Sequence, residues 1–267
     1  MRIWAIANQK GGVGKTTSVV ALGGLLAERG ERVLVVDLDP HGSLTSWFGY
    51  DPDTLSHTVF DLFQHQGRIP DGLPARLITG TGCDRMSLLP ASTALATLER
   101  RMAGIEGMGR IISRTLAQLR GDFDYVLLDN TPSLGVLMVN ALAAAQHLII
   151  PVQTEYLAIK GLERMLHTLE MITRSQQNAP SYTIVPTLFD RRTQASVRSL
   201  NQLRKSYPDT LWRFVIPVDT KFRDASQAGR TPSAFDTETH GVRAYARLLK
   251  DLPEMSGAQS GPISRSG

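Results

Sequence analysis

The chain has 267 residues, of which 42% are hydrophobic and 20% are charged, a composition that suits one large α/β domain with a sizeable core. The single cysteine, Cys83, excludes a disulfide framework and a four-cysteine metal site. No apolar run is long enough to span a membrane, and the first residues carry no signal peptide, so we expect a cytoplasmic protein without a membrane helix.

Short aliphatic runs predict strands at residues 3–7, 32–37, 125–129, 147–152, 182–187 and 212–217. The runs are nearly continuous, as is typical of strands buried on both faces of a parallel sheet. Apolar stripes between them predict helices at residues 16–29, 111–119, 159–173, 197–205 and 242–249. Residues 51–90 are rich in Pro, Gly and Asp, and we interpret them as irregular chain with one short helix at 57–65.

The alternation of strands and helices predicts a single-domain, doubly wound α/β fold, with a mostly parallel sheet and helices on both faces. We expect this domain to span residues 1–252. The last residues, 253–267, are rich in Ser and Gly, and we expect them to form a disordered polar tail.

A glycine-rich segment joins the first predicted strand to the first predicted helix, which is the context that a phosphate-binding loop requires. The residues that we expect to bind the nucleotide are Lys10, Gly11, Gly12, Val13, Gly14, Lys15, Thr16 and Thr17. The glycines let N–H groups point inward at an anion, and the helix N-terminus adds positive potential. Lys15 is expected to reach the β- and γ-phosphates, and Thr16 to place its hydroxyl on Mg²⁺. Gln9 replaces the first glycine of the usual pattern, and a second lysine, Lys10, opens the loop.

Three aspartates lie at or just beyond the ends of predicted strands, at the carboxyl edge where ligands of such sheets bind. Asp129 and Asp37 each end a strand, and with Thr16 they are the candidates for the Mg²⁺ site. Asp39 follows on a loop that can move, and we expect it to orient the attacking water. The structural alternative for Asp37 or Asp39 is that the aspartate caps the next helix.

These segments resemble the ParA/MinD superfamily of deviant Walker A ATPases, and the resemblance covers residues 1–252. Besides the loop, the matching strings are V-D-L-D-P-H-G-S at 36–43, D-Y-V-L-L-D-N-T-P-S-L-G at 124–135 and P-V-Q-T-E-Y at 151–156. They are similar to the ParA/Soj branch, and the segments at 1–10 and 39–43 are similar to ParC-like relatives that position chemotaxis arrays. The family usually has Gln in place of His41, and often a second Pro in place of Thr131, which leaves the hydrolysis rate open.

The resemblance implies a homodimer that encloses two ATP molecules, in which Lys10 of each subunit contacts the nucleotide of its partner. Lys10, Lys15 and Asp39 would be the catalytic residues, and Pro217 and Asp219 would complete the nucleotide site. The resemblance also implies slow ATP hydrolysis stimulated by an activating protein, either a ParB-like protein or a chemotaxis-array adaptor. A nucleoid-associated or polar position in the cell would follow.

The last quarter of the chain is basic, since residues 190–250 hold 12 Lys and Arg against 6 Asp and Glu, in a chain of net charge +4. In the family, positions that match Arg192 and Lys221 bind DNA nonspecifically, and Arg223 lies beside Lys221 in the sequence. The resemblance therefore implies that these side chains contact DNA phosphates. Pairing of the arginines with local acids, or a solvated helix face, is the alternative.

Two other functions are compatible with the loop. One is a metabolic P-loop enzyme that couples ATP hydrolysis to a small-molecule substrate, although we see no residue signature of a second substrate pocket. An iron protein of this kind is disfavoured because one cysteine in each chain cannot hold a cluster. The other is a scaffold that binds ATP without useful hydrolysis. The Ser- and Gly-rich tail argues against the MinD branch, whose members end in a basic membrane helix.

Overall fold

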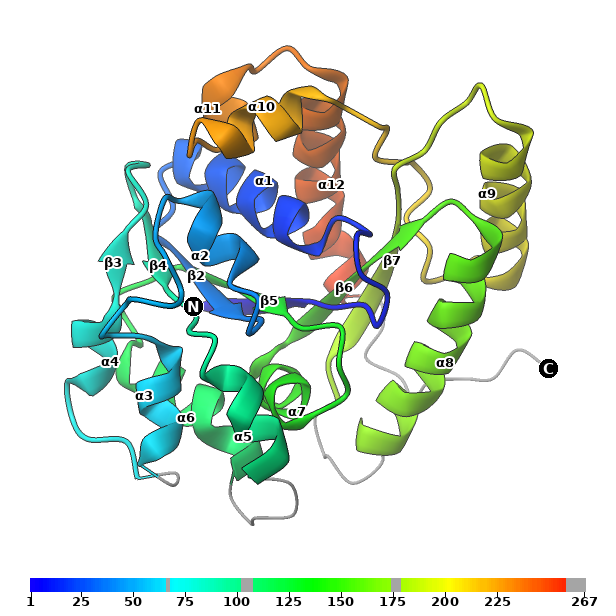
Figure 1. The fold of residues 1–267 in the computed structure, drawn as a ribbon. Coiled ribbons are helices and arrows are strands. Elements are labelled where there is room, and N and C mark those ends of the chain that lie inside the picture. The colour runs from blue at the N-terminus through cyan, green and yellow to red at the C-terminus, as the bar shows by residue number, and fades with distance from the viewer. Residues whose placement is uncertain (66–67, 102–107, 174–178, 258–267) are drawn as a thin grey trace.

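The computed structural model describes residues 1–65, 68–101, 108–173 and 179–257, and Figure 1 shows a central sheet with helices packed around it. The sheet has the strand order β3-β4-β2-β5-β1-β6-β7. Its strands are β1 (Arg2–Ile6), β2 (Val33–Leu38), β3 (Thr79–Gly80), β4 (Met86–Leu89), β5 (Tyr125–Asn130), β6 (His147–Gln153) and β7 (Ser181–Thr187). Neighbouring strands pair in parallel except β3 and β4, which are antiparallel. The predicted mostly parallel α/β fold is confirmed.

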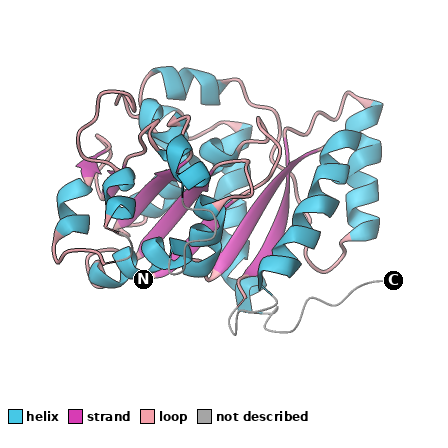
Figure 2. Cartoon of the chain, turned by 60° about the horizontal axis from the view of Figure 1, so that its bottom comes forward, coloured by secondary structure: helices cyan, strands magenta, loops and turns pink. Residues whose placement is uncertain are grey.

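Helices cover both faces of this sheet, as Figure 2 shows. They are α1 (Lys15–Glu28), α2 (Ser43–Trp47), α3 (Val59–Gln64), α4 (Leu73–Leu77), α5 (Leu95–Arg101), α6 (Ile111–Gln118), α7 (Val136–Ala144), α8 (Tyr156–Thr173), α9 (Gln194–Ser206), α10 (Lys221–Gln227), α11 (Pro232–Phe235) and α12 (His240–Gly257). A short 3-10 turn, η1 (Met108–Arg110), precedes α6. Within the described ranges, no helix combines the length and apolar character needed to cross a bilayer.

Alternate residues of each central strand enter two separate cores. In β1, Ala5 packs with α6, α7 and α8, whereas Trp4 and Ile6 pack with α1 and α12. In β2, Val36 joins the first core and Val35 joins the second. Burial on both faces explains why these strands are aliphatic at nearly every position. Because β1, β2, β5, β6 and β7 run in parallel, their carboxyl ends share one edge of the sheet, where the loop of residues 10–14 lies.

The strand predicted at 212–217 is wrong. This segment runs beside β7, but only isolated bridges join the two, from Ile184 to Leu211 and from Phe189 to Pro217. A continuous ladder cannot form because Pro186 of β7 lacks the N–H group that would donate to the segment. The chain bends between the two contacts instead.

Residues 51–90 contain more structure than the irregular chain that we expected. The predicted short helix is present as α3, where Thr58 and Asp61 form a capping box. Strands β3 and β4 were missed because they have only 2 and 4 residues. At the other end of the chain, α12 continues to Gly257 and so includes the first residues of the expected tail, whereas residues 258–267 lie outside the described part.

Candidate nucleotide-binding site

The loop between β1 and α1 has the backbone of an anion cradle. Gly12 and Gly14 have φ angles of 74° and 90°, a left-handed region that glycine adopts without a Cβ clash. A Cβ placed on Gly11, Gly12 or Gly14 would meet no atom within 4 Å, so the loop borders open space. Gly14 also caps α1, whose first residue is Lys15. The free N–H groups of a helix N-terminus therefore border the same space.

Hydrogen bonds to β6 and β7 hold this loop. Asn8 is fully buried, and its side-chain amide donates to the carbonyl of Pro151 in β6 at 2.7 Å while its oxygen accepts from the N–H of Lys10 at 3.0 Å. On the other side, the hydroxyl of Thr187 at the end of β7 donates to the carbonyl of Val13 at 2.8 Å. The cradle is thus fixed to the carboxyl edge of the sheet.

Lys15 places its ammonium group inside the cradle. Its Nζ lies 3.4 Å from the carbonyl oxygen of Lys10, and the residue is 8% exposed. Burial lowers the pKa of Lys15, whereas the charges of Asp129 and Asp39 act to raise it. A buried cation between two carboxylates is suited to an anionic ligand that replaces the missing hydration.

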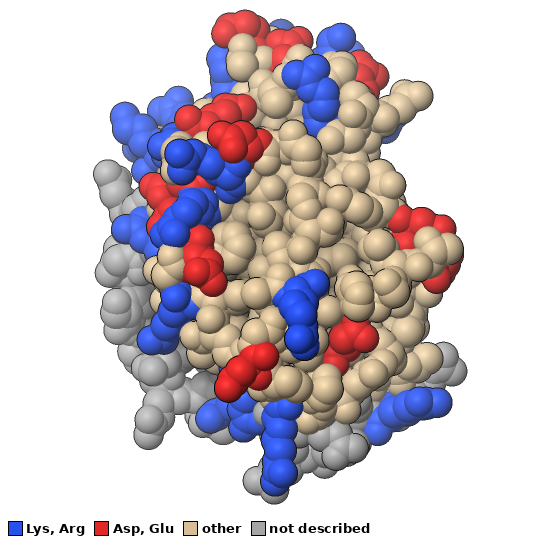
Figure 3. All heavy atoms as spheres, turned by 90° about the vertical axis from the view of Figure 1, so that its left-hand side faces the viewer, with Lys and Arg blue, Asp and Glu red and all other residues tan. Residues whose placement is uncertain are grey.

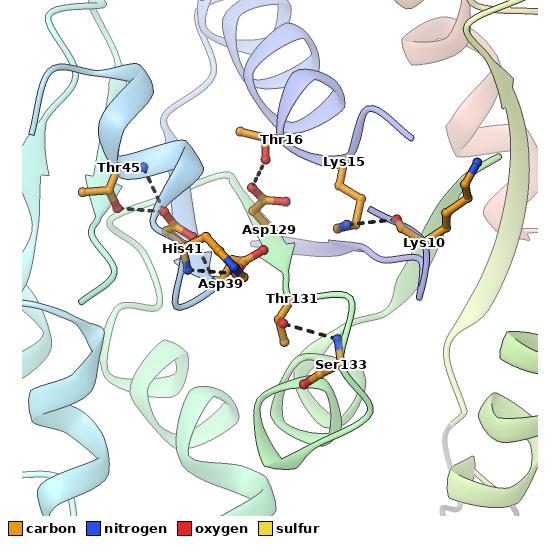
Figure 4. Close-up of polar contacts among 10 residues, drawn as sticks. Lys10, Lys15, Thr16, Asp39, His41, Thr45, Asp129, Thr131 and Ser133 are labelled. Atoms are coloured by element: carbon orange, nitrogen blue, oxygen red, sulfur yellow. Dashed lines mark hydrogen bonds and ion pairs between the residues drawn. The ribbon is translucent and has the colours of Figure 1, made fainter. Parts of the chain in front are cut away.

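Thr16 and Asp129 meet beneath the loop, as Figure 4 shows. The Thr16 hydroxyl donates to Asp129 Oδ2 at 2.6 Å, and Asp129 Oδ1 is buried without a hydrogen-bond partner in the described structure. Burial, followed by the charge of Asp37, raises the pKa of Asp129 well above its ordinary value. An unpartnered carboxylate oxygen beside a hydroxyl is the oxygen donor set that Mg²⁺ prefers. These two residues fit the metal that the sequence predicts.

Asp37 accepts hydrogen bonds from Thr45 in α2. Its Oδ2 accepts from the N–H of Thr45 at 2.8 Å and from the Thr45 hydroxyl at 2.7 Å, and its Oδ1 accepts from the N–H of Asp39 at 3.1 Å. Burial raises the pKa of Asp37 to about 6. These contacts favour the structural alternative, in which Asp37 caps the following helix. A role at Mg²⁺ stays a prediction, although Asp37 lies opposite Asp129 in the sheet register.

Asp39 is held by its neighbour His41. Asp39 Oδ1 accepts from the His41 N–H at 3.0 Å and lies 2.8 Å from His41 Nδ1, while the imidazole ring is largely exposed. Thr131 lies nearby in Figure 4, where its hydroxyl accepts from the N–H of Ser133 at 3.3 Å. The two residues that depart from the family pattern therefore both lie at this site.

Lys10 turns away from the cradle. In Figure 4 its side chain extends in the direction opposite to Asp129, toward the end of β6. Its Nζ donates to Gln153 Oε1 at 3.0 Å and forms an ion pair with Glu155. Lys10 thus stands on the rim of the site, bound within its own chain.

A pocket of about 430 Å³ continues from the loop. Gly14 and Thr17 line it together with Pro217 and Asp219, so the structure brings together two parts of the predicted nucleotide site that are distant in sequence. Asp219 is already bonded, since its Oδ2 accepts from the N–H of Gly241 at 2.9 Å. Further lining residues were not predicted, namely Trp47, Thr187, Leu188, Ile216, Phe222, Ser226, Gln227 and Tyr245. No sequence motif marks them, because the fold alone brings their elements together.

The predicted DNA-contacting residues have local partners. Arg192 forms a bidentate pair with Asp190, with Nη2 to Oδ2 at 2.8 Å, and this pair lowers the pKa of Asp190 to about 2. Lys221 lies 3.7 Å from Asp224, and Arg223 lines the nucleotide pocket. Arg192 therefore has the local acidic partner that the sequence alternative describes, and DNA contact by these residues stays a prediction. The side of the molecule drawn in Figure 3 intersperses acidic with basic groups around a broad uncharged area.

Comparison with known proteins agrees with this geometry. Residues 1–181 match a family model described as an AAA domain. Over 252 residues the chain is 32% identical to the sporulation initiation inhibitor protein Soj of Bacillus subtilis, covering 94% of this chain and 98% of that protein. Over 255 residues it is 31% identical to the chromosome partitioning protein ParA of Caulobacter vibrioides, covering 94% of each.

Solved structures share the fold. Cobyrinic acid a,c-diamide synthase from Mycobacterium smegmatis, with bound ADP and magnesium, has a TM-score of 0.80 and 34% identity, covering 97% of this chain and 96% of that chain. A Cyanothece McdA variant in complex with ATP has a TM-score of 0.81 at 20% identity, covering 96% of each chain, which is a likeness of fold.

Loop, lysine, metal donors and pocket define the class of the protein as a P-loop ATPase, with ATP and Mg²⁺ as its cofactors. The chain belongs to the ParA/Soj family of this class. The chemotaxis-array subgroup stays a prediction.

Proposed function

We propose that this chain is a switch that ATP closes into a homodimer and that hydrolysis reopens, in order to position or segregate a cargo. The observation that carries the proposal is an apolar rim around the phosphate cradle. Leu134, Tyr156 and Leu157 are 48%, 63% and 70% exposed, and they follow β5 and β6 at the same edge as Lys10. Exposed large apolar side chains beside a ligand site favour a surface that a second copy covers. Lys10 on the same rim would supply a cation to the partner's nucleotide.

The chain's own residues have distinct tasks in hydrolysis. The loop N–H groups and Lys15 hold the β- and γ-phosphates, and Thr16 with Asp129 would hold Mg²⁺. The metal, when bound, neutralises charge on the phosphate oxygens. Asp39 orients the attacking water, and His41 fixes the Asp39 carboxylate through Oδ1. Enclosure between two subunits would exclude bulk water and strengthen these charge interactions.

The cargo that the relatives favour is DNA. Soj and ParA relatives are named for chromosome partitioning, which supports chromosome or plasmid segregation with a ParB-like activator in the cytoplasm, on the nucleoid. A polar chemotaxis array with its own adaptor is a second cargo of the same switch. Nonspecific DNA contact by Lys221 and Arg223 would require the Lys221 ammonium group to leave Asp224, which lies 3.7 Å away.

The turnover of ATP tests this function. A switch should hydrolyse ATP slowly alone and faster with duplex DNA and a ParB-like protein, and Lys15→Ala should abolish ATP binding. Single-turnover measurements on the isolated protein would separate the switch from a scaffold that never hydrolyses ATP. Rapid turnover that needs neither DNA nor a protein partner would contradict the proposal.

A metabolic P-loop enzyme is the second candidate, and the likeness to cobyrinic acid a,c-diamide synthase at 34% identity favours it. Such an enzyme would hydrolyse ATP only in step with a small acid substrate. Assay of ATP turnover with small carboxylic acids and an amino-group donor discriminates the two. Stimulation by these compounds, with no response to DNA or protein, would support the metabolic enzyme.

A further inference from the structure

A second hollow, of about 510 Å³, lies between α9, α12 and the segment that follows α9. We name it the arginine groove, and its lining includes Leu200, Arg204, Arg213, Phe214, Arg243 and Arg247. The groove shares two walls with the nucleotide pocket, because residues 211–217 and α12 contribute side chains to both. Figure 1 shows α9 and α12 on either side of that segment.

The floor of the groove is apolar. Trp212 is 1% exposed and packs edge-on against the half-buried Phe214, with ring centroids 5.5 Å apart. Leu200 of α9 is 5% exposed, and Val197 on the rim is 38% exposed. The indole N–H of Trp212 already has a hydrogen-bond partner, since Nε1 donates to Asp251 Oδ2 at 2.9 Å. The floor therefore offers apolar surface without an unpartnered indole group.

The rim of the groove is cationic, and its arginines are held in place. Arg247 and Arg213 both stack on the ring of Phe214, with Cζ atoms 3.2 Å and 4.9 Å from its centroid. Arg204 donates from Nη2 to the carbonyl of Arg213 at 3.3 Å. None of these three has a carboxylate at ion-pair distance among the described residues, whereas Arg243 pairs with Glu238 at 3.5 Å. Stacked guanidinium groups keep in-plane donors free for carboxylates.

From this combination we infer that the arginine groove is a docking site for an acidic segment of a partner protein, anchored by an apolar side chain. The apolar anchor would enter the hollow between Leu200 and Phe214, and flanking carboxylates would pair with Arg204, Arg213 and Arg247. An aromatic or aliphatic anchor in a pocket with a charged rim is the usual form of a small binding hot spot. The groove would bind such a segment whether or not ATP closes the chain into a dimer.

The apolar floor favours a protein segment over nucleic acid. A DNA backbone presents phosphates and sugars, and its nonspecific contacts are made by cations that need no apolar hollow beneath them. The Ser- and Gly-rich tail of this chain carries no acidic residue between 256 and 267, so it lacks the charges to fill the groove itself. Charge complementarity thus points to an acidic, apolar-anchored partner.

Selection of displayed random peptides on the immobilised full-length protein, with ATP and Mg²⁺ present, tests the inference. The enriched peptides should combine Asp or Glu with an aromatic or aliphatic anchor. A fluorescein-labelled copy of one such peptide should bind Arg204→Glu and Arg247→Glu at least tenfold more weakly than the unmodified protein. Arg76→Glu, an exposed arginine on α4 at the opposite side of the molecule, is the matched control and should bind normally.

Three results would overturn the inference. Enrichment of neutral or basic peptides, or of no peptide, would show that the groove does not select an acidic segment. Equal binding of an acidic peptide to the Arg204→Glu, Arg247→Glu and Arg76→Glu proteins would place its site elsewhere. If a DNA duplex displaces the peptide and binds more tightly, and the same two variants lose that binding, the groove belongs to nucleic acid. Circular dichroism of each variant ensures that a loss of binding is not a loss of folding.

Discussion

At the scale of single residues, Lys10 connects the loop to its surroundings. It is the lysine that distinguishes this loop from the usual pattern, and the described chain holds it with Gln153 and Glu155 on the rim. A cation paired within its own chain must leave that partner before it can reach a nucleotide across a dimer interface. In the proposed dimer, Glu155 would therefore compete with ATP for the same ammonium group.

Glu155→Gln should lower the ATP concentration that half-saturates dimer formation. The Lys10 and Glu155 side chains are 31% and 39% exposed, and such pairs contribute only about 0.2–1 kcal/mol, so we expect a shift of roughly twofold to fivefold. Light scattering during an ATP titration measures it. Glu163→Gln, which removes the exposed pair with Lys160 on α8, is the control and should not shift the midpoint. An unchanged or higher midpoint for Glu155→Gln would argue against competition.

His147 predicts a specific dependence of stability on pH. It is 1% exposed, lies between the hydroxyls of Ser181 and Thr183, and burial lowers its pKa to about 4. In the unfolded chain this histidine binds a proton near pH 6.5, whereas in the folded chain it stays neutral down to about pH 4. The free energy of unfolding therefore keeps the contribution of neutral His147 above pH 6.5 and loses it as the pH falls toward 4.

The loss amounts to about 2–4 kcal/mol in the free energy of unfolding over this range. Urea titrations at several pH values measure it. His147→Gln should remove this loss of stability between about pH 6.5 and pH 4, whereas His57→Gln, at an exposed position, should leave the loss in place. A slope unaltered by His147→Gln would contradict the assignment.

The sequence identifies which residues form the site better than it identifies the groups to which they bond. The phosphate-binding loop, Thr16 and Asp129 could be assigned because one short motif and one strand end specify them. The hydrogen bonds that Thr45 donates to Asp37 were foreseen only as an alternative, since they depend on how the loop after β2 turns back into α2. The pairing of Arg192 with Asp190 was a foreseeable alternative, because the two residues lie two positions apart.

At the scale of elements, long periodic segments could be predicted and short ones could not. Five of the predicted strands and the five longer predicted helices are present, because their apolar patterns extend over several residues. Strands β3 and β4 are set by pairing next to β2, which no local pattern encodes. The error at 212–217 has the opposite cause, since an apolar run lies beside β7 but Pro186 of β7 has no N–H to continue the ladder.

The packing of α1 gives a prediction at this scale. A Cβ on Gly24 would lie 2.6 Å from the Cβ of Thr231, so Gly24→Ala should destabilise the fold by about 1–3 kcal/mol through overpacking. Gly161→Ala on α8 is a matched control, because its Cβ would meet no atom within 4 Å and alanine favours the helix by about 1 kcal/mol. Thermal unfolding should show opposite shifts in Tm. Equal shifts would show that α1 can relax away from Thr231.

At the scale of the whole molecule, the parallel sheet gathers the site at one edge. Lys10 and Lys15 follow β1, Asp39 follows β2, and Asp129 lies near the end of β5. The same edge exposes Leu134, Tyr156 and Leu157. A nucleotide site and exposed apolar side chains on one surface are what an ATP-dependent dimer requires.

The molecular mass in solution with ATP and Mg²⁺ tests this account most directly. Asp39→Ala should slow hydrolysis and hold the protein as a dimer, at twice the single-chain mass of 29.3 kDa, in light scattering after size-exclusion chromatography. Asp39→Ala combined with Lys10→Ala should bind ATP equally well and remain at the single-chain mass. A dimer that persists without Lys10, or an Asp39→Ala protein that stays monomeric in ATP, would contradict the account.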